Sequence, residues 1–326
     1  MGGISTASHG EHLIRSEIWS QQLKDTFEED LIGWKYIDMI TSEFPDGDKL
    51  NIPSIGAMEV QDYAEGHAVK YTAMDTGNFE FVITEYKASG TYVYDKFKQD
   101  SFYADRVIAQ FVPKMNRALQ ETMEMDAMRV GPDNQTASDG NIINGAAHRL
   151  VASGTGETML PKDFARARFA LRKANVPMTN LVAIVDPSVE FALSTMTNLT
   201  NHISNPNWEG AIGTGLTTGM KFITRIFGFD VYTSDFLKIN TASETIDLAS
   251  VGGPSGTVAA GVNNLFFSVD ASPFIGAVRQ PPRVESERNK DFQRDEYVVT
   301  CRYGLDLFRP EALVVILTDT DQVYSV

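Results

Sequence analysis

One glycine-rich stretch, GAIGTGLTTGMK at residues 210 to 221, has the composition of a phosphate-binding loop. Such a loop requires four residues between its glycines, followed directly by lysine and then serine or threonine. Here three residues separate Gly215 from Gly219, and Lys221 does not follow directly. The dinucleotide-binding spacing also fails, because Gly219 comes one residue late. The stretch is therefore predicted to be a flexible loop.

The histidines and carboxylates are the other candidates for chemistry. The histidines are scattered over the N-terminal stretch and loops, with no cysteine or carboxylate at metal-ligand spacing; they are His9, His12, His67, His148 and His202. A Ser-His-Asp triad assembles from distant positions, so the sequence leaves it open, but the Gly-x-Ser-x-Gly elbow of hydrolases is absent. We therefore predict no catalytic, cofactor-binding or metal site and expect that the protein is not an enzyme.

Composition narrows the class of protein further. The 326 residues carry a net charge of −15, which repels nucleic acid at long range and argues against sequence-specific DNA binding, although not against enclosing DNA. The single cysteine, Cys301, rules out an intrachain disulfide, and its alternating surroundings predict a buried strand residue. Without a signal-like or membrane-spanning apolar run, we expect a soluble protein made in the cytoplasm.

The element around which the chain is organised is a long amphipathic helix, predicted from Asp100 to Val130. Apolar residues recur every three or four positions on one face: Ile108, Phe111, Met115, Leu119 and Met123. Pro113 predicts a kink within one rod, and Gly131-Pro132 predicts its end. A helix of this length spans about 45 Å at ~1.5 Å per residue, more than the width of a small domain.

The stretch from Lys49 to Asp95 is predicted to form strands. Aromatic and β-branched residues alternate with polar ones: Val69, Tyr71, Phe79, Phe81, Ile83, Tyr92 and Tyr94. A hairpin this long and polar cannot be a core strand pair, and an isolated hairpin is marginal in water. Two interpretations carry equal weight here, namely a protruding hairpin covered by a neighbouring subunit and a meander folded back on its own domain.

The remainder of the chain is predicted to alternate helices and strands. An amphipathic helix in LPKDFARARFALRKANVP has a predicted buried side made of Phe164, Ala167, Phe169, Leu171 and Ala174. It precedes a buried strand in NLVAIVDP, a helix in SVEFALSTM and a strand pair around Gly228. The continuously apolar run from Ala312 to Thr318 predicts a central strand.

In this order, the stretches resemble the HK97-type major capsid protein of tailed bacteriophages. The likeness covers roughly Glu17 to Asp319, and it is carried by EIWSQQL, DGDKLNIPSIGAMEVQDYAEGHAVKY, the long helix, RFALRKANVP with LVAIVDPSVEFAL, FGFDVYTSDFL, PPRVESERN and DEYVVTCRYGLDLFRPEALVVI. Each motif is weak alone, and their order and spacing together are fairly specific.

The resemblance implies an α+β fold divided into four parts. These are an N-terminal arm and helix at 1–48, an extended loop at 49–95, a peripheral domain with the spine helix at 96–135 and 280–326, and an axial domain at 136–279. It further implies pentamers and hexamers that close into an icosahedral virion capsid around double-stranded DNA. Portal, scaffolding or cement proteins are the implied partners, with no membrane. Some members crosslink subunits through lysine and asparagine, but no motif singles out Lys70 or Lys87 for that role.

Two other functions stay open at this point. An encapsulin-like compartment would share the fold and would need cargo in place of DNA, and an α/β enzyme of unknown class would form no shell. Electron microscopy distinguishes shell from enzyme, and DNA content distinguishes capsid from compartment.

If the chain builds a shell, two sets of residues are candidates for contacts between subunits. The first is aromatic, because aromatic anchors dominate interface energetics, and consists of Phe79, Phe81 and Tyr86. The second alternates both signs of charge, which fixes register, and consists of Arg283, Glu285, Glu287, Arg288 and Arg294. Arg288 and Arg294 are expected to face carboxylates of a neighbour. The alternative for the charged set is an ordinary solvated strand edge.

Overall fold

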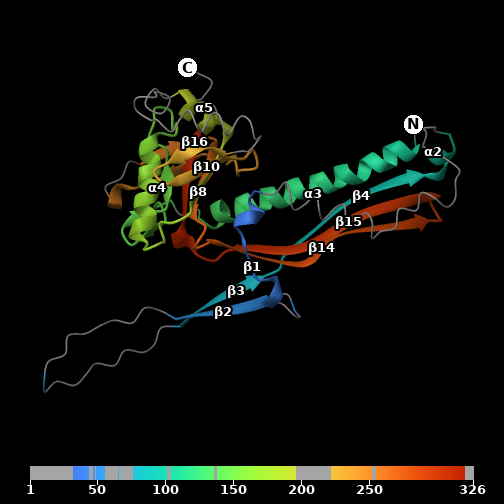
Figure 1. Cartoon of the computed structure of the whole chain (residues 1–326), viewed down its shortest axis with the longest axis horizontal. Helices are drawn as coiled ribbons and strands as arrows, with labels where there is room; N and C mark the ends of the chain where they lie inside the picture. The colour runs from blue at the N-terminus through green and yellow to red at the C-terminus, as the bar shows by residue number, and fades with distance from the viewer. Residues whose placement is uncertain are drawn as a thin grey trace.

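A computed structural model of the chain describes residues 32–43, 47, 49–55, 65, 76–100, 104–135, 138–195, 222–251 and 255–319. The described residues form a layered body, a long two-layer arm and a hairpin that stands away from both (Figure 1). Most of the N-terminal arm and helix expected at 1–48 lies outside the described residues, because these begin at position 32. So do the strand signals at Val69 and Tyr71 and the glycine-rich stretch at 210–221.

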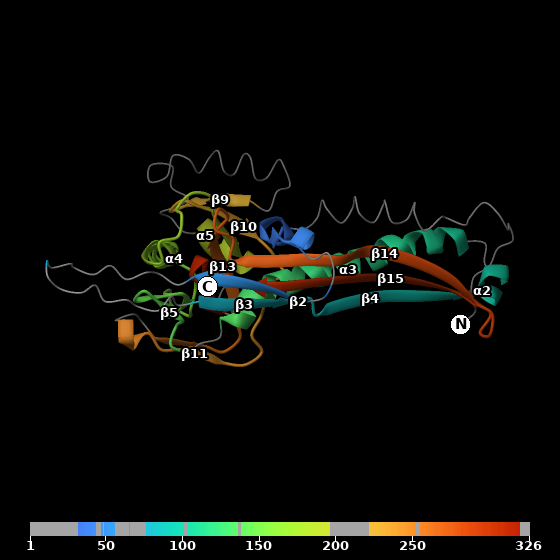
Figure 2. The same cartoon turned by 90° about the horizontal axis from the view of Figure 1, so that it is seen from below.

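The arm consists of helix α3 (Ala104–Asn134) lying along a four-stranded sheet. The strands lie in the order β1 (Asp38–Met39), β14 (Phe274–Asn289), β15 (Arg294–Leu307) and β4 (Glu85–Tyr94). β14, β15 and β4 pair antiparallel, β1 adds parallel to β14, and the short helix α2 (Asp95–Asp100) follows β4. Figure 2 shows the three long strands side by side with α3 along them.

The helix and the sheet are held together by one apolar layer. Met115, Leu119 and Met123, four residues apart on α3, pack against strand side chains of β14 and β15: Val284, Val299, Cys301 and Tyr303. The predicted apolar face of the helix is thus confirmed at these three positions, as is the buried state of Cys301. Burial also raises the pKa of the Cys301 thiol to about 11, so the thiol stays protonated at neutral pH.

The predicted single rod is confirmed, since α3 runs without a break through Pro113, but its predicted ends are wrong. The helix begins at Ala104, after the separate helix α2, and it continues through Gly131-Pro132 to Asn134. Gly131 is a packing residue rather than a helix stop. A Cβ atom there would lie 2.5 Å from Cδ2 of Leu313 and 3.3 Å from the ring of Phe274.

The body is built on a six-stranded mixed sheet with α4 (Pro161–Lys173) and α5 (Pro187–Thr195) around it. Its strand order is β7 (Arg149–Val151), β16 (Leu313–Asp319), β13 (Gly261–Ser268), β8 (Leu181–Val185), β10 (Phe229–Thr233) and β9 (Phe222–Ile226). Small two-stranded elements flank the sheet: β5 (Ile142–Ile143) with β6 (Ala146–Ala147), and β11 (Glu244–Ile246) with β12 (Gly256–Val258).

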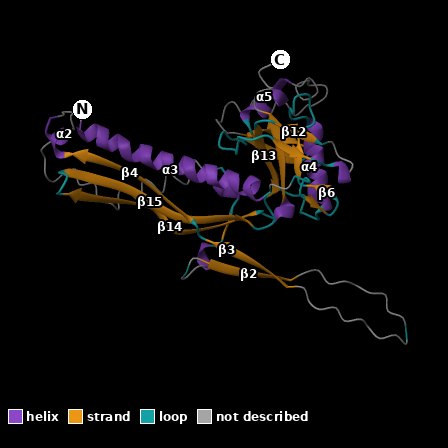
Figure 3. Ribbon diagram, turned by 180° about the vertical axis from the view of Figure 1, so that it is seen from behind, coloured by secondary structure: helices purple, strands orange, loops and turns teal. Residues whose placement is uncertain are grey.

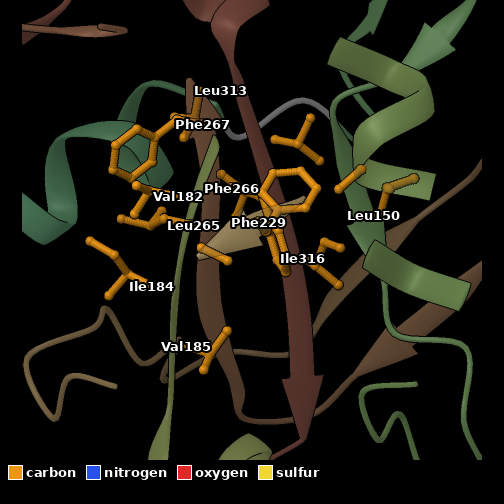
Figure 4. Close-up of a cluster of buried hydrophobic side chains, with 14 of the residues drawn as sticks. Leu150, Val182, Ile184, Val185, Phe229, Leu265, Phe266, Phe267, Leu313 and Ile316 are labelled. Atoms are coloured by element: carbon orange, nitrogen blue, oxygen red, sulfur yellow. The ribbon is translucent and has the colours of Figure 1, made fainter. Parts of the chain in front are cut away.

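The body core centres on aromatic side chains that meet edge to face. The rings of Phe164, Phe229 and Phe266 lie with centroids 5.1 to 6.4 Å apart. Figure 4 shows Phe229 and Phe266 among the aliphatic side chains of the sheet. Such edge-to-face pairs contribute about 0.5–1.5 kcal/mol each beyond the area they bury.

The predicted buried side of α4 is correct at Phe164, Ala167 and Leu171 but wrong at Phe169, which is 58% exposed. At about 100° per residue, position 169 lies about 140° around the helix from Phe164, whereas position 171 returns to the same side.

The strand pair predicted around Gly228 is confirmed. β9 and β10 pair antiparallel, and Phe227 and Gly228 form the turn between them at positive φ.

The last strand, β16, confirms one prediction and corrects another. It is buried and pairs with β13 on one side and β7 on the other, as expected for a central strand. It belongs, however, to the six-stranded sheet and not with the arm strands where 280–326 was placed, and β14 already begins at Phe274. A continuously apolar strand needs cover on both faces, which the body provides and the two-layer arm does not.

The segment 33–40 fastens the arm to the body. The backbone N–H of Gly33 donates to Oε1 of Glu124 at 2.9 Å, and Nε1 of Trp34 donates to the carbonyl of Met123 at 3.1 Å. Beyond the 3-10 turn η1 (Trp34–Tyr36), the Tyr36 ring packs edge to face on Phe267 in the body core, with centroids 5.4 Å apart. The two parts therefore share one continuous packing.

We predict that Gly131→Ala destabilises the subunit although alanine favours helix more than glycine. Overpacking a filled core costs about 1–3 kcal/mol, which exceeds the gain of about 0.5–1 kcal/mol in helix preference. Chemical denaturation of the unassembled subunit, followed by circular dichroism, measures the change. Gly90→Ala on β4 is the control, because its Cβ would make only an ordinary contact of 3.4 Å. A Gly131→Ala subunit as stable as the wild type would contradict the assigned packing.

Candidate assembly interface

The hairpin of β2 (Lys49–Ile55) and β3 (Thr76–Val82) is fixed to the protomer only at its base among the described residues. There, Phe81 and Ile83 join Ile40, Ile275 and Ala277 in a small apolar cluster, and Phe79 packs edge to face on Phe308. From the base the two strands pair in register out to Ile55 and Thr76. Figure 3 shows the hairpin standing off from both arm and body, as the protruding alternative predicted, whereas β4 of the same stretch pairs with β15 in the protomer's own sheet, as the meander alternative predicted.

The three aromatic candidates occupy different environments. Phe81 has no exposed surface in the protomer, so its predicted role as an intersubunit contact is wrong and it belongs to the core. Phe79 is half-buried against Phe308 and keeps part of its surface free. Tyr86, on β4, is 63% exposed and stays a candidate for contact with another subunit.

The sheet of the arm has one covered face and one outer face. Side chains alternate along a strand, so residues facing α3 alternate with residues facing away. Tyr86, Tyr92 and Tyr94 are all exposed at even positions of β4, and Val298 lies opposite Gly90 on the same side of β15. The outer face therefore carries an exposed aromatic row. Sequence reasoning recognised Tyr92 and Tyr94 as strand residues and Tyr86 as a contact candidate, but it missed their shared face, which the even spacing from Tyr86 could have revealed.

The charged residues at the far end of the arm pair within the protomer. Arg288 forms an ion pair with Asp95 at 2.6 Å, and Lys98 forms one with Asp295. Arg294 pairs with Glu296 at 2.6 Å. The protomer thus already supplies a carboxylate to Arg288 and to Arg294, and the contact of these two residues with carboxylates of a neighbour stays a prediction.

Arg294 is further fixed by aromatic contacts. Its guanidinium lies 4.5 Å from the ring centroid of Tyr92 and 4.8 Å from that of Phe292. Its hydrogen bond lowers the pKa of Glu296, which keeps that carboxylate charged into acidic solution. The far end of the arm is thus a preorganised, exposed and charged surface.

The other charged candidates line the outer face. Arg283 and Glu285 form an exposed ion pair at 3.4 Å, and Glu287 is exposed two residues further along β14. Exposed ion pairs contribute only about 0–1 kcal/mol to folding. These three side chains are therefore available for other contacts, and their role between subunits stays a prediction.

A hollow of about 570 Å³ opens on the same face. It is lined by Tyr86, Arg279, Gln280, Pro281, Pro282, Arg283, Glu285 and Thr300. It coincides with the irregular part of β14, where the register against β15 shifts twice between Val278 and Arg283. Proline cannot donate to a strand ladder, and an interruption of this kind bends the strand locally.

A polar network on the covered face locks α3 to the sheet. The hydroxyl of Tyr303 donates to Oδ2 of Asp126 at 2.6 Å, and Nζ of Lys87 lies 3.1 Å from the same oxygen. Lys87 also pairs with Glu85 at 2.7 Å, and that hydrogen bond is the main cause of its raised pKa. Burial and the bond to Asp126 raise the pKa of Tyr303, so its hydroxyl remains a donor.

The described residues hold no arrangement typical of a metal site, since no group of three His, Cys, Asp or Glu side chains gathers among them. His148 is buried in the body, where burial lowers its pKa and Nδ1 lies 3.1 Å from the carbonyl of Ala146. No described helix is long and apolar enough to cross a membrane.

Comparison with protein-family models assigns the chain to a family. The model described as "Phage capsid protein" matches residues 78–316, from β3 to β16. The chain belongs to the phage capsid protein family. A search of curated proteins finds no match.

Solved structures of phage capsids share the fold. A solved structure of Mycobacterium phage Che8 is similar at a TM-score of 0.63 and 20% identity, covering 88% of this chain and 91% of that one. The mature capsid of bacteriophage PhiM1 is similar at a TM-score of 0.61 and 10% identity, covering 98% of this chain and 91% of that one. An encapsulin complex from Synechococcus elongatus is similar at a TM-score of 0.55 and 12% identity, covering 90% of each chain. This capsid protein therefore has the HK97-type fold that its sequence resembles.

We predict that Phe81→Ala destabilises the subunit by about 3–5 kcal/mol, because it empties a fully buried site at the base of the hairpin. Denaturation of unassembled subunits measures the loss. Tyr86→Ala is the matched control, since that ring is exposed, and it should change stability by less than about 0.5 kcal/mol. If the wild-type and Phe81→Ala subunits are equally stable, Phe81 is again a candidate for contact between subunits.

Proposed function

We propose that this protein forms the shell of a tailed-phage virion, assembling as pentamers and hexamers that close into an icosahedral capsid around double-stranded DNA. Its membership of the phage capsid family and its HK97-type fold support a structural role in the capsid. Synthesis in the host cytoplasm, and portal, scaffolding or cement proteins as partners, belong to the same proposal.

The observation that carries the proposal is the unfinished surface of the protomer. The β2–β3 hairpin leaves the body with contacts only at its base among the described residues, and an isolated two-stranded hairpin is marginal in water. Beyond the base of the hairpin, the outer face of the arm sheet is likewise exposed, at Tyr86, Tyr92, Tyr94 and Val298. Contacts in which one patch meets a different patch on the next copy close into rings. A ring or shell therefore supplies the cover that one copy lacks.

Sheet membership suggests how the chain divides within this shell. We assign α3, β4, β14 and β15 to the peripheral domain and residues 138–273 to the axial domain. The final strand, β16, then returns to the axial domain. The hairpin at 49–82 serves as the extended loop, which is shorter than the 49–95 first expected because β4 belongs to the arm sheet.

The charge of the chain suits a container for DNA. At a net −15, each copy repels the phosphate backbone at long range, so the packaged DNA is enclosed without being bound by sequence. An encapsulin-like compartment has the same fold, and the absence of packaged DNA would favour it.

Negative-stain electron microscopy of the purified recombinant protein tests the shell. We expect closed particles tens of nanometres wide or the rings from which they form, and phage-derived particles should contain double-stranded DNA. A protein that stays monomeric at high concentration over a range of salt would contradict the proposal, and shells that carry protein cargo in place of DNA would identify a compartment.

We predict that Arg288→Glu combined with Arg294→Glu reduces the yield of particles while the subunit stays folded. The reversal places carboxylates against Asp95 and Glu296, which disorders the charged end of the arm, but ion pairs that remain accessible to solvent contribute only about 0–1 kcal/mol each to folding. Particle yield and the melting temperature of the subunit are measured together. Arg172→Glu with Lys173→Glu, on the exposed end of α4, changes the net charge equally and should assemble normally. Unchanged yield at both low and high salt would show the far end of the arm to be solvated surface.

A further inference from the structure

Helix α4 concentrates positive charge on a chain that is acidic as a whole. The complete chain has 28 Lys and Arg against 43 Asp and Glu. The lysines and arginines within the 13 residues of α4 are Lys162, Arg166, Arg168, Arg172 and Lys173. The one carboxylate of the helix, Asp163, is buried and pairs with Arg166 at 3.0 Å. Figure 1 shows α4 on the side of the body away from the arm.

The outward face of α4 is cationic with one aromatic ring at its centre. At about 100° per residue, Lys162, Phe169 and Lys173 lie within about 40° of one another, on the side opposite the buried residues of the helix. Phe169 is 58% exposed. Lys162, Arg172 and Lys173 are exposed, and none of them forms an ion pair with the residues that the structure describes. This face therefore has cations that no carboxylate of the described protomer neutralises.

A second exposed phenylalanine is held beside the same helix. Phe227, in the turn between β9 and β10, is 48% exposed and has a φ of 49°, which bulky residues rarely adopt. Nη1 of Arg168 donates to the carbonyl of Phe227 at 2.7 Å, so α4 holds the turn in place. Backbone outliers of this kind gather at functional sites. The exposed surface thus extends from α4 onto the turn.

Unpaired cations around exposed aromatic rings suit nucleic acid. Lysine and arginine neutralise phosphates without reading sequence, and aromatic side chains contact sugars and bases. Lys162 and Lys173 are separated by about 16 Å along the helix axis at ~1.5 Å per residue. Their side chains can therefore reach both phosphate backbones across a major groove that is ~12 Å wide.

We propose that the outward face of α4 and the β9–β10 turn contact the packaged double-stranded DNA, with Lys162, Arg172 and Lys173 binding phosphates. The proposal rests on the shell function above and turns this face toward the interior of the shell. At a net −15 the chain repels DNA at long range, so the contact is local and independent of sequence. DNA is favoured over an acidic protein, because interfaces with DNA are much more positively charged than protein–protein interfaces, in which lysine is depleted.

Charge reversal separates this contact from assembly. Fluorescence anisotropy with a short labelled duplex of mixed sequence measures the affinity of unassembled subunits. Arg172→Glu with Lys173→Glu should weaken that affinity by about tenfold or more, because two phosphate contacts become repulsions, and should form particles as the wild type does. Arg288→Glu with Arg294→Glu, at the far end of the arm, changes the net charge equally and should leave the affinity within about twofold of the wild type. Circular dichroism verifies that both variants fold.

The salt dependence of the affinity counts the phosphate contacts. Each contact contributes about 0.9 to the slope of log affinity against log salt concentration. Arg172→Gln with Lys173→Gln should therefore reduce the slope by about two. Phe169→Ala should weaken binding and leave the slope unchanged, because it removes no charge.

Three results would overturn the contact with DNA. They are a wild-type subunit that does not bind the duplex, an α4 variant that binds it as the wild type does, and displacement of the duplex by poly-glutamate at equal charge concentration, which would identify an acidic protein as the ligand. Loss of assembly in the α4 variant would also contradict it and would make this face a contact between copies. Electron microscopy of the wild type reports on the shell function independently of these results.

Photo-crosslinking in DNA-filled particles tests the orientation of the face. Phe169→p-benzoylphenylalanine should join the chain to DNA on irradiation. The same replacement at Phe292, which is 62% exposed at the far end of the arm, is the control and should give no DNA adduct. Crosslinks from position 169 to protein alone would overturn the proposal.

Discussion

The structure depends on the packing of one helix face against one sheet face. Met115, Leu119 and Met123 of α3 bury the covered face of β14 and β15, and the same helix continues into the body, where Ala127 and Met128 join the main core. Gly131 then allows α3 to approach β16 closely. Because the arm beyond the base of the hairpin has only two layers, its core there lies between them, and the other face of its sheet must lie on the surface. The exposed tyrosines, and the hollow beside Pro281 and Pro282, lie on that face.

Periodicity in the sequence was sufficient to predict elements but not which chain or face covers them. The spacing of apolar residues predicted α3, the buried β8 and the interior strand β16, whose patterns are strong and continuous. Phe81 alternates with polar residues as an interface residue would, yet the base of the hairpin folds onto Ile40 and Ile275. Phe169 shows the converse, since an apolar residue of α4 lies on the exposed side. In both cases, tertiary contacts decide whether the apolar side chain is buried within the protomer, which the local pattern leaves open.

The candidate interface was harder to predict than the fold, for a physical reason. Charges at the far end of the arm suggested contacts with a neighbour, but Asp95 and Glu296 satisfy Arg288 and Arg294 within the protomer because β4 and β15 bring them together. The hollow arises from two shifts in strand register near Pro281 and Pro282. A register shift changes which side chains share a face, and it cannot be read from an alternating pattern. The resemblance to capsid proteins predicted the order of the elements along the chain but not their strand register.

The central claim is that the apolar cores of the arm and the body are complete within one copy, whereas the β2–β3 hairpin is covered only in the shell. Hydrogen–deuterium exchange, compared between unassembled subunits and assembled particles, tests this directly. The account predicts that α3 and β15 are protected in both states, and that amides of β2 and β3 beyond the base become protected only on assembly. Equal protection of the hairpin in free subunits and particles, or an arm that gains protection only in particles, would contradict it.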